Sequence, residues 1–408
     1  MSQEPAVLAR PLLVRGIGEL ITNAPDVPGE LGAIEDAAVA LRDGAIVWAG
    51  ADDEVPVALL RSPVLDVEGR AVLPGFVDSH THLVFAGDRA AEFSARLEGS
   101  SYEEILAGGG GIHSTVKATR TASLDDLVMQ STERARRMLL MGTTTVEVKS
   151  GYGLTVSDEL RMLEAARSVA DSTGIGVVST FLGAHVPDLG TTEADYVDLV
   201  VEQMLPAVAG HAAFCDVFVD RGAFSINSAR RVFETARQVG LVPRLHAEQL
   251  THTGAAALAA EVGAASADHL DHVTVEDAAA LAGAGVVAVM LPGAGFSMRA
   301  PQAPARMLWD AGVVMALATD CNPGTSYVEG MSIVIALACL EMDLTPAEAV
   351  WAATRGGARS LQRPELGIVL PGAAADLVVL DAPSHQHIPY RPGTNLVWKV
   401  IKAGAVVE

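Results

Sequence analysis

From about residue 75 onward, short apolar runs alternate with longer stretches rich in alanine. Short apolar runs bounded by turn residues are typical of buried parallel strands, and the stretches between them have the length of helices. The pattern predicts helices at 125–141, 158–172, 228–239 and 276–282. It predicts eight strands, at 72–79, 143–148, 177–182, 217–220, 242–246, 266–269, 286–291 and 314–319.

Eight strands with helices between them predict an α/β fold in which the strands close into a (β/α)8 barrel of the TIM type. The predicted barrel has about 290 residues, close to the usual size of that fold. An open, doubly wound sheet is the alternative. It is less favoured because no Gly-x-Gly-x-x-Gly turn follows any of the eight runs.

The two ends of the chain share a second pattern, in which short β-rich runs are bounded by Gly, Pro or Asp. These runs lie at 45–48, 64–67, 366–369, 375–380 and 396–401. Two β-rich ends that flank a barrel most simply come together as one unit. We therefore expect a small β-sandwich-like domain built from residues 1–74 and 363–408, beside a catalytic barrel of residues 75–362.

One stretch, 278–298, has 21 residues without a charge, which by count alone is long enough to span a bilayer. Several glycines and Pro292 interrupt it. We interpret it as the end of a helix, a buried strand at 286–291 and a Gly-rich loop, and we predict no contact with a membrane.

The composition and net charge of the chain limit which molecules it can bind. Apolar residues make up 50% of the chain and charged residues 19%, which is typical of a soluble globular protein. The 28 Lys and Arg against 50 Asp and Glu give a formal charge of −22, which would repel a phosphate backbone, so nucleic acid is not expected. An anionic substrate would need a cation placed inside its pocket.

Cysteine usage and the N-terminal residues bear on the compartment. The three cysteines are too few for a disulfide framework. Residues 1–15 contain an acidic residue and no sustained apolar core, so no secretory signal is indicated. We expect a cytoplasmic protein.

Histidines and one aspartate fall at the ends of predicted strands. His80 and His82 follow the first strand, one residue apart, so both imidazoles can point the same way and meet one ion. A lone His-x-His could also be a pair of ordinary loop histidines. However, the fifth, sixth and eighth strands end at His246, His269 and Asp320. The ends of the strands in a closed barrel converge on one mouth.

Three histidines and one carboxylate with an open position are typical of a mononuclear hydrolytic metal site. We assign His80, His82, His246 and Asp320 as ligands. His269 is then free to act as a general acid or base near neutral pH. The alternative for His269 is a fourth nitrogen ligand.

This arrangement, with its flanking β domain, resembles the amidohydrolase superfamily. Longer motifs sharpen the resemblance to one cyclic amidohydrolase of that superfamily over about residues 70–360. They are Leu73–Arg89, Glu147–Leu154, Leu182–His185, Leu245–Gln249, Ala267–Leu270 and Ala318–Thr325.

The resemblance implies a metal-dependent hydrolase of histidine degradation, with one zinc or iron ion. Its substrate is a small anionic imidazolone, 4-imidazolone-5-propanoate, and its product is N-formimidoyl-L-glutamate. Arg89, seven residues past His82, can supply a bidentate partner for the propionate. Its alternative role is a surface ion pair with Asp88 or Glu92.

Other residues of these motifs are candidates for substrate binding. Tyr152 lies between two glycines and can offer a hydroxyl, or it can simply pack in its loop. The resemblance places His185 against the substrate ring. Asn322, Gly324 and Thr325 follow Asp320 and can offer an amide, backbone N–H groups and a hydroxyl, although Asn-Pro-Gly is also ordinary turn chemistry.

Two departures limit what the resemblance implies. Gln249, three residues after His246, stands where relatives carry Glu or Gln, and a Gln cannot take a proton. We therefore assign proton transfer to Asp320 and His269 and leave Gln249 as a group that hydrogen-bonds the substrate. The fourth predicted strand ends at Asp220 without the bridging lysine of two-metal relatives, and Lys149 follows the second strand, so a single metal is favoured.

In the expected mechanism, water deprotonated toward Asp320 attacks the ring carbonyl, and His269 protonates the leaving ring nitrogen while Arg89 and Tyr152 hold the propionate. A deaminase or iminohydrolase of the same superfamily is the leading alternative. A hydrolase of another cyclic amide or a lactone and a non-catalytic barrel are further ones. We expect a homodimer, the commonest oligomer of soluble enzymes.

Overall fold

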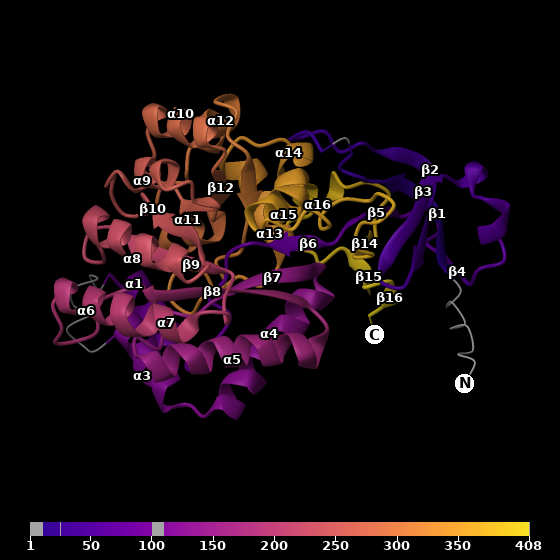
Figure 1. Ribbon diagram of the computed structural model, residues 1–408. Coiled ribbons are helices and arrows are strands. Elements are labelled where there is room, and N and C mark those ends of the chain that lie inside the picture. The colour runs from indigo at the N-terminus through magenta and orange to yellow at the C-terminus, as the bar shows by residue number, and fades with distance from the viewer. Residues whose placement is uncertain (1–10, 25, 100–109, 408) are drawn as a thin grey trace.

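The computed structural model describes residues 11–24, 26–99 and 110–407. Positions 1–10, 25, 100–109 and 408, which fall within the predicted domain ranges, lie outside the described residues. In Figure 1, a barrel with helices around it lies beside a smaller sheet that contains both early and late segments of the chain. The predicted (β/α)8 barrel with a second sheet from the termini is confirmed.

The barrel consists of eight parallel strands in the order β13-β12-β11-β10-β9-β8-β7-β6. The ring closes through a parallel bridge between Thr81, just after β6, and Cys321, just after β13. The backbone N–H of Asp320 also donates to the carbonyl of His80 at 3.0 Å. The strands are β6 (Phe76–Asp78), β7 (Thr143–Lys149), β8 (Gly176–Ala184), β9 (Phe214–Val219), β10 (Val242–Ala247), β11 (Ser266–His269), β12 (Val287–Met290) and β13 (Met315–Leu317).

Several helices begin at a residue whose side chain caps them. Ser123, Thr274 and Thr345 each form a capping box with the acidic residue three positions later, which satisfies backbone N–H groups of the first turn. The helices around the barrel are α1 (Ala90–Leu97), α3 (Ile112–Thr121), α4 (Leu124–Leu140), α5 (Val156–Thr173), α6 (Glu193–Leu199), α7 (Leu205–Val208), α8 (Ile226–Gln238), α9 (Ala255–Glu261), α10 (Val275–Ala284), α11 (Pro292–Met298), α12 (Ala305–Asp310), α13 (Met331–Glu341), α14 (Pro346–Trp351), α15 (Gly357–Ser360) and α16 (His387–Tyr390).

The second sheet has the order β16-β15-β14-β5-β1-β2-β3, with β4 paired to β1. Hydrogen bonds between Ile46 and the segment 372–373 connect its N-terminal and C-terminal parts around a separate apolar core. The strands are β1 (Leu12–Leu20), β2 (Ile34–Arg42), β3 (Ala45–Ala51), β4 (Val64–Asp66), β5 (Ala71–Pro74), β14 (Leu377–Leu380), β15 (Val397–Lys402) and β16 (Ala405–Val406).

The predicted strand at 72–79 divides between the two sheets. Its first half, β5, pairs with β1 and β14, and its second half, β6, pairs with β7 of the barrel. Gly75 lies between them and donates its N–H to the carbonyl of Asp376. A Cβ at Gly75 would overlap the side chain of Thr144. We propose the boundary between the two domains at this glycine, as the sequence predicts.

Two predicted elements are wrong. Residues 366–369 form no strand, because Gly367 has φ +66° and the backbone N–H groups of Leu366 and Val369 bond separate partners, the carbonyls of Arg363 and Thr22. Residues 292–298 form α11 instead of a Gly-rich loop, and Pro292 occupies the first turn, where its missing N–H is not needed. The strand within the uncharged stretch is present as β12, and no helix among the described residues is long and apolar enough to cross a membrane.

A partly buried ion pair joins the terminal sheet to the barrel. Arg355, in the π-helical turn Ala352–Gly356, is 7% exposed and donates Nε and Nη2 to the two carboxylate oxygens of Asp26, at 2.7 and 2.9 Å. Arg359 donates to the carbonyl of Asp26 at 2.7 Å. Burial alone would raise the pKa of Asp26, but the hydrogen bonds from both arginines outweigh it and hold the pKa below its ordinary value.

We predict that Asp26→Asn lowers the free energy of unfolding at neutral pH by about 1–3 kcal/mol, because a buried guanidinium loses its charged partner. Since the pKa of Asp26 is lowered in the folded state, this contribution is present above the unfolded pKa and is lost as pH falls through the folded one. Denaturant unfolding at about pH 7 and about pH 3.5, with the exposed Glu30→Gln as control, checks it. An equal deficit at both pH values would contradict the prediction.

Candidate metal centre at the mouth of the barrel

Ring nitrogens from two barrel strands and one carboxylate converge at the ends of the strands. His80 and His82 follow β6, His246 lies in β10 and Asp320 follows β13, and each is at most 3% exposed. Nε2 of His82 lies 3.3 Å from Nε2 of His246. Nε2 of His80 and of His82 each lie 3.6 Å from Oδ1 of Asp320.

This donor set fits a divalent cation. Nδ1 of His80 bonds Oδ2 of Asp268 at 2.7 Å, and Nδ1 of His246 bonds Oδ1 of Asp216 at 3.1 Å, so each ring presents the lone pair of Nε2 to the cluster. Nε2 of His80 is buried and has no hydrogen-bond partner among the described residues. Ligand atoms of His80, His82 and His246 lie within 4.8 Å of one another.

The electrostatics of the cluster also suit metal binding. Burial lowers the pKa of His80 and of His82 well below the ordinary value of 6.5, so both rings are neutral, the form that ligates. Burial raises the pKa of Asp320 well above its ordinary value. A cation among these groups would compensate a carboxylate that is costly to bury alone.

His269 lies in the same cluster, at the end of β11. Its ring centre is 5.5 Å from that of His80 and 5.3 Å from that of His246, and ligand atoms of His269, His80 and Asp320 lie within 4.8 Å of one another. His269 and Leu270 have φ values of +77° and +66°, a strained backbone for residues with side chains. Its position fits either a proton-transfer group or a further ligand.

A group of buried charged residues behind the histidines was missed by the sequence reasoning. Burial would lower the pKa of Lys149, but the charges of Asp216 and Glu147 outweigh it and raise the pKa above the ordinary value. The residues lie inside strands and alternate with apolar neighbours, which is the signal that could have identified them. They are Glu147, Lys149, Asp216, Arg244 and Asp268, all fully buried.

Tyr152 and His185 lie against His82. The ring of His185 stacks on that of His82 with centres 5.1 Å apart, and the ring of Tyr152 is 5.7 Å from it. Nδ1 of His185 bonds the carbonyl of Gly151 at 3.0 Å, and burial lowers the pKa of His185 to about 3. Burial and the charge of Asp320 raise the pKa of Tyr152. Both side chains are therefore neutral hydrogen-bonding groups beside the candidate ligands.

Arg89 forms the ion pair with Glu92 that was considered as its alternative role, and its part in substrate binding stays a prediction. Its Nε donates to Glu92 at 2.7 Å, and Glu92 in turn accepts from the N–H of Gly111 and the hydroxyl of Ser114. The guanidinium is 17% exposed and lies against Gly324, where a Cβ would overlap Nη1. The ion pair with Glu92 thus orients the guanidinium beside the loop that follows Asp320.

The polar groups of that loop bond mainly to each other. Oδ1 of Asn322 accepts the N–H groups of Gly324 and Thr325 at 2.8 Å each, and Nδ2 donates to the carbonyl of Asp320 at 2.7 Å and to Oγ1 of Thr325 at 3.0 Å. The amide of Asn322 is therefore fully used within its turn. This arrangement corresponds to the turn chemistry considered as the alternative, and it suits Asn322 to shaping the loop.

Gln249 is half-buried in the loop after β10, and its side chain has no hydrogen bond to the residues that the structure describes. Its neighbour Glu248 is fully buried with φ +54° and accepts the N–H groups of Thr253 and Ala256. The assignment of Gln249 as a substrate-binding group stays a prediction.

Known proteins share this fold and much of this sequence. The model of the amidohydrolase family matches residues 71–407. Imidazolonepropionase of Salinispora arenicola is 52% identical over 397 residues, 96% of this chain and 98% of the relative. Imidazolonepropionase of Mycolicibacterium smegmatis is 50% identical over 399 residues, 97% of each chain. An adenosine deaminase from Xanthomonas campestris, crystallised with bound zinc, matches with a TM-score of 0.74 at 20% identity, over 97% of this chain and 92% of that one.

Proposed function

The chain belongs to the amidohydrolase family, in the group of the imidazolonepropionases, and from that premise we propose how its residues hydrolyse 4-imidazolone-5-propanoate to N-formimidoyl-L-glutamate. It is a hydrolase acting on a cyclic C–N bond in histidine degradation. The convergence of His80, His82, His246 and Asp320 in one buried cluster is the observation that carries the proposed site.

His80, His82, His246 and Asp320 would hold one divalent ion, with zinc and iron as the candidates because both accept nitrogen and oxygen ligands. When bound, such an ion acidifies a water molecule and polarises a carbonyl oxygen. The ends of β6 and β13 hydrogen-bond each other, and Asp216 holds the ring of His246, so the donor set is held before any ligand arrives.

We assign the proton transfers to Asp320 and His269. Asp320 accepts a proton from the attacking water, whose oxygen bonds the ring carbonyl carbon. The C–N bond to that carbon then breaks, its electron pair passes to the ring nitrogen, and His269 relays to that nitrogen the proton that Asp320 took from the water. One water is consumed and its two protons are accounted for, one on the nitrogen and one released or retained by the product carboxyl group.

The propionate of the substrate would bind Arg89. Glu92 occupies Nε of the guanidinium, so Nη1 and Nη2 remain to face a carboxylate. Tyr152 and His185 would bound the ring side of the pocket, with the loop containing Gly324 and Thr325 opposite. Gln249, in the loop after β10, would hydrogen-bond the substrate.

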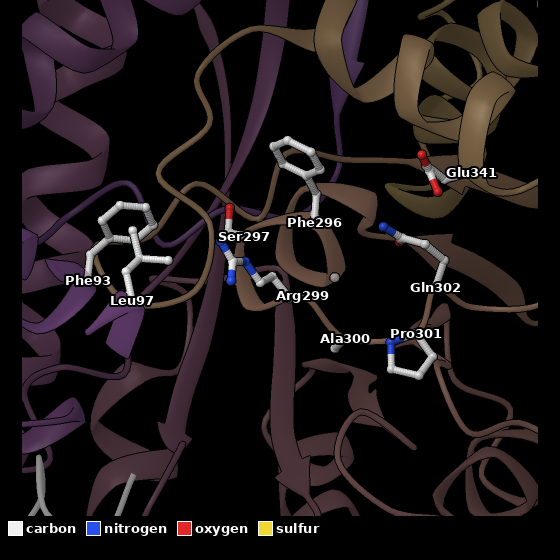
Figure 2. A pocket seen from close by; sticks show the side chains of 10 residues that line it. Phe93, Leu97, Phe296, Ser297, Arg299, Ala300, Pro301, Gln302 and Glu341 are labelled. Atoms are coloured by element: carbon white, nitrogen blue, oxygen red, sulfur yellow. The ribbon is translucent and has the colours of Figure 1, made fainter. Parts of the chain in front are cut away.

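A homodimer is also proposed. Exposed apolar side chains of α1 and α11 border a surface cavity of about 820 Å³, which Figure 2 shows between Phe93, Leu97 and Phe296. Phe296 is 62% exposed, and contiguous apolar surface of this kind marks association sites.

We predict that Phe296→Glu converts the protein from a dimer to a monomer, as measured by sedimentation velocity. A wild-type monomer, or a variant that still dimerises through this face, would contradict it.

Since all three cysteines are free, we propose a cytoplasmic location.

We predict that the metal-loaded protein opens the ring of freshly prepared 4-imidazolone-5-propanoate without releasing ammonia and that chelation abolishes the reaction. His269→Ala and Asp320→Asn should lower kcat by at least about 100-fold, because each removes a proton-transfer group. The assay follows N-formimidoyl-L-glutamate and ammonia together. Release of ammonia would instead support a deaminase or iminohydrolase.

We predict that Gly324→Ala raises KM at least about tenfold with a smaller change in kcat, since the added methyl displaces the guanidinium that holds the propionate. Arg89→Ala should lower kcat/KM by several orders of magnitude. Gly283→Ala is the matched control, because its Cβ would enter open space in α10. Unchanged kinetics in Gly324→Ala and Arg89→Ala would remove Arg89 from the substrate site.

A further inference from the structure

The ammonium of Lys149 takes no part in the reaction above, yet it contacts three buried carboxylates. Lys149 ends β7 and its side chain is fully buried. Nζ lies 2.8 Å from Oε1 of Glu147 and 2.7 Å from Oδ2 of Asp216, and 3.7 Å from Oδ2 of Asp268. A lysine so placed needs carboxylates around it, because an unpaired buried charge is costly.

Two of these carboxylates orient candidate metal ligands directly. Oδ2 of Asp268, the oxygen that faces Lys149, also bonds Nδ1 of His80 at 2.7 Å. Asp216 bonds both the backbone N–H and Nδ1 of His246 through Oδ1, at 3.1 Å each, while its Oδ2 accepts from Lys149. The tautomer and tilt of each ring therefore depend on a carboxylate that Lys149 contacts.

The third carboxylate holds the backbone between the other two ligands. Oε2 of Glu147 accepts the N–H of Thr81, the residue between His80 and His82, at 3.2 Å, while its Oε1 accepts from Lys149. The backbone N–H of Lys149 itself donates to the carbonyl of Thr81 at 2.9 Å. One lysine thus connects to the supports of all three histidines.

We propose that Lys149 is a positioning residue of the metal centre: its ammonium gathers Glu147, Asp216 and Asp268 so that the nitrogens of His80, His82 and His246 face one ion. This inference rests on the proposed metal site. Three N–H donors on a tetrahedral ammonium suit three carboxylates that approach from different strands.

The neighbouring cation Arg244 does not duplicate this role. Its Nη2 lies 3.3 Å from Oδ2 of Asp268 and donates to the carbonyl of Ser79 and the hydroxyl of Ser360. Among the described residues, it forms no ion pair with Glu147 or Asp216. Removing Arg244 therefore deletes a buried cation that contacts only one of the three carboxylates, Asp268. The contacts of Lys149 with Glu147 and Asp216 remain, which makes the Arg244 variant a matched control.

The test compares wild-type protein with Lys149→Met and Arg244→Met. Affinity for Zn²⁺ is measured by competition with a chromophoric chelator, and the geometry of the site is followed by the visible absorption of bound Co²⁺. Denaturant unfolding of the metal-free proteins measures stability separately. Glu147→Gln serves as a milder second variant, because it removes one support without leaving the ammonium unpaired.

We expect Lys149→Met to lower Zn²⁺ affinity at least about 100-fold and to change the Co²⁺ spectrum, since loss of one outer support alone costs about 10–100-fold. Arg244→Met should lower affinity by at most about tenfold even where it destabilises the metal-free protein as much. If Lys149→Met does not fold, Glu147→Gln should still lower affinity about tenfold with a changed spectrum.

The proposal is overturned if Lys149→Met keeps wild-type Zn²⁺ affinity and an unchanged Co²⁺ spectrum, because Lys149 would then be only a structural ion pair. If Lys149→Met does not fold, the same result in Glu147→Gln would overturn it. Equal losses in Lys149→Met and Arg244→Met with unchanged Co²⁺ spectra would do the same. A wild-type protein that binds neither ion would overturn the metal site itself, and this proposal with it.

Discussion

The ion pairs of Lys149 with Glu147 and Asp216 lie inside the barrel without exposure to solvent, and the site depends on them. Moving a charge out of water costs several kcal/mol even after relaxation, so each buried charge must find a partner of opposite sign. In this chain Glu147 lies on the same strand as Lys149, and Asp216 lies on β9, two strands away in the barrel. Asp216 also bonds the ring of His246, and Asp268, the third carboxylate near Lys149, bonds the ring of His80, so the packing of the barrel interior also orients these ligands.

The terminal sheet is tied to the barrel at two places that are far apart in the sequence. Only Gly75 separates β5 of the terminal sheet from β6 of the barrel, so the segment that leads to His80 and His82 is hydrogen-bonded in both sheets. Asp26 and Arg355 join the first loop of the chain to the turn before α15. The terminal sheet therefore stabilises the start of the first barrel strand.

The substrate side of the site is built from two loops that meet where the barrel closes. The bridge between Thr81 and Cys321 brings the loop of Arg89 against the loop of Gly324. Asn322 shapes the second loop through its own amide, and Glu92 orients Arg89 through the start of α3. Arg89 and Asn322, which the sequence suggests as ligand-binding residues, thus already form hydrogen bonds within the protein.

The sequence by itself determined the barrel, its eight strands and the positions of His80, His82, His246 and Asp320, because periodicity and strand ends are local features of a chain. It misplaced the strand at 366–369 and the loop at 292–298, where backbone φ and helix-capping decided the outcome. Only the tertiary structure revealed that Lys149 joins Glu147, Asp216 and Asp268, that Glu92 holds Arg89, and that the amide of Asn322 is already satisfied. The contacts of Lys149 with Asp216 and Asp268 join three strands and depend on the register of the closed barrel, which no single segment encodes. Glu92 and the amide of Asn322 bond groups close to them in sequence, and the backbone path of their loops decides those partners.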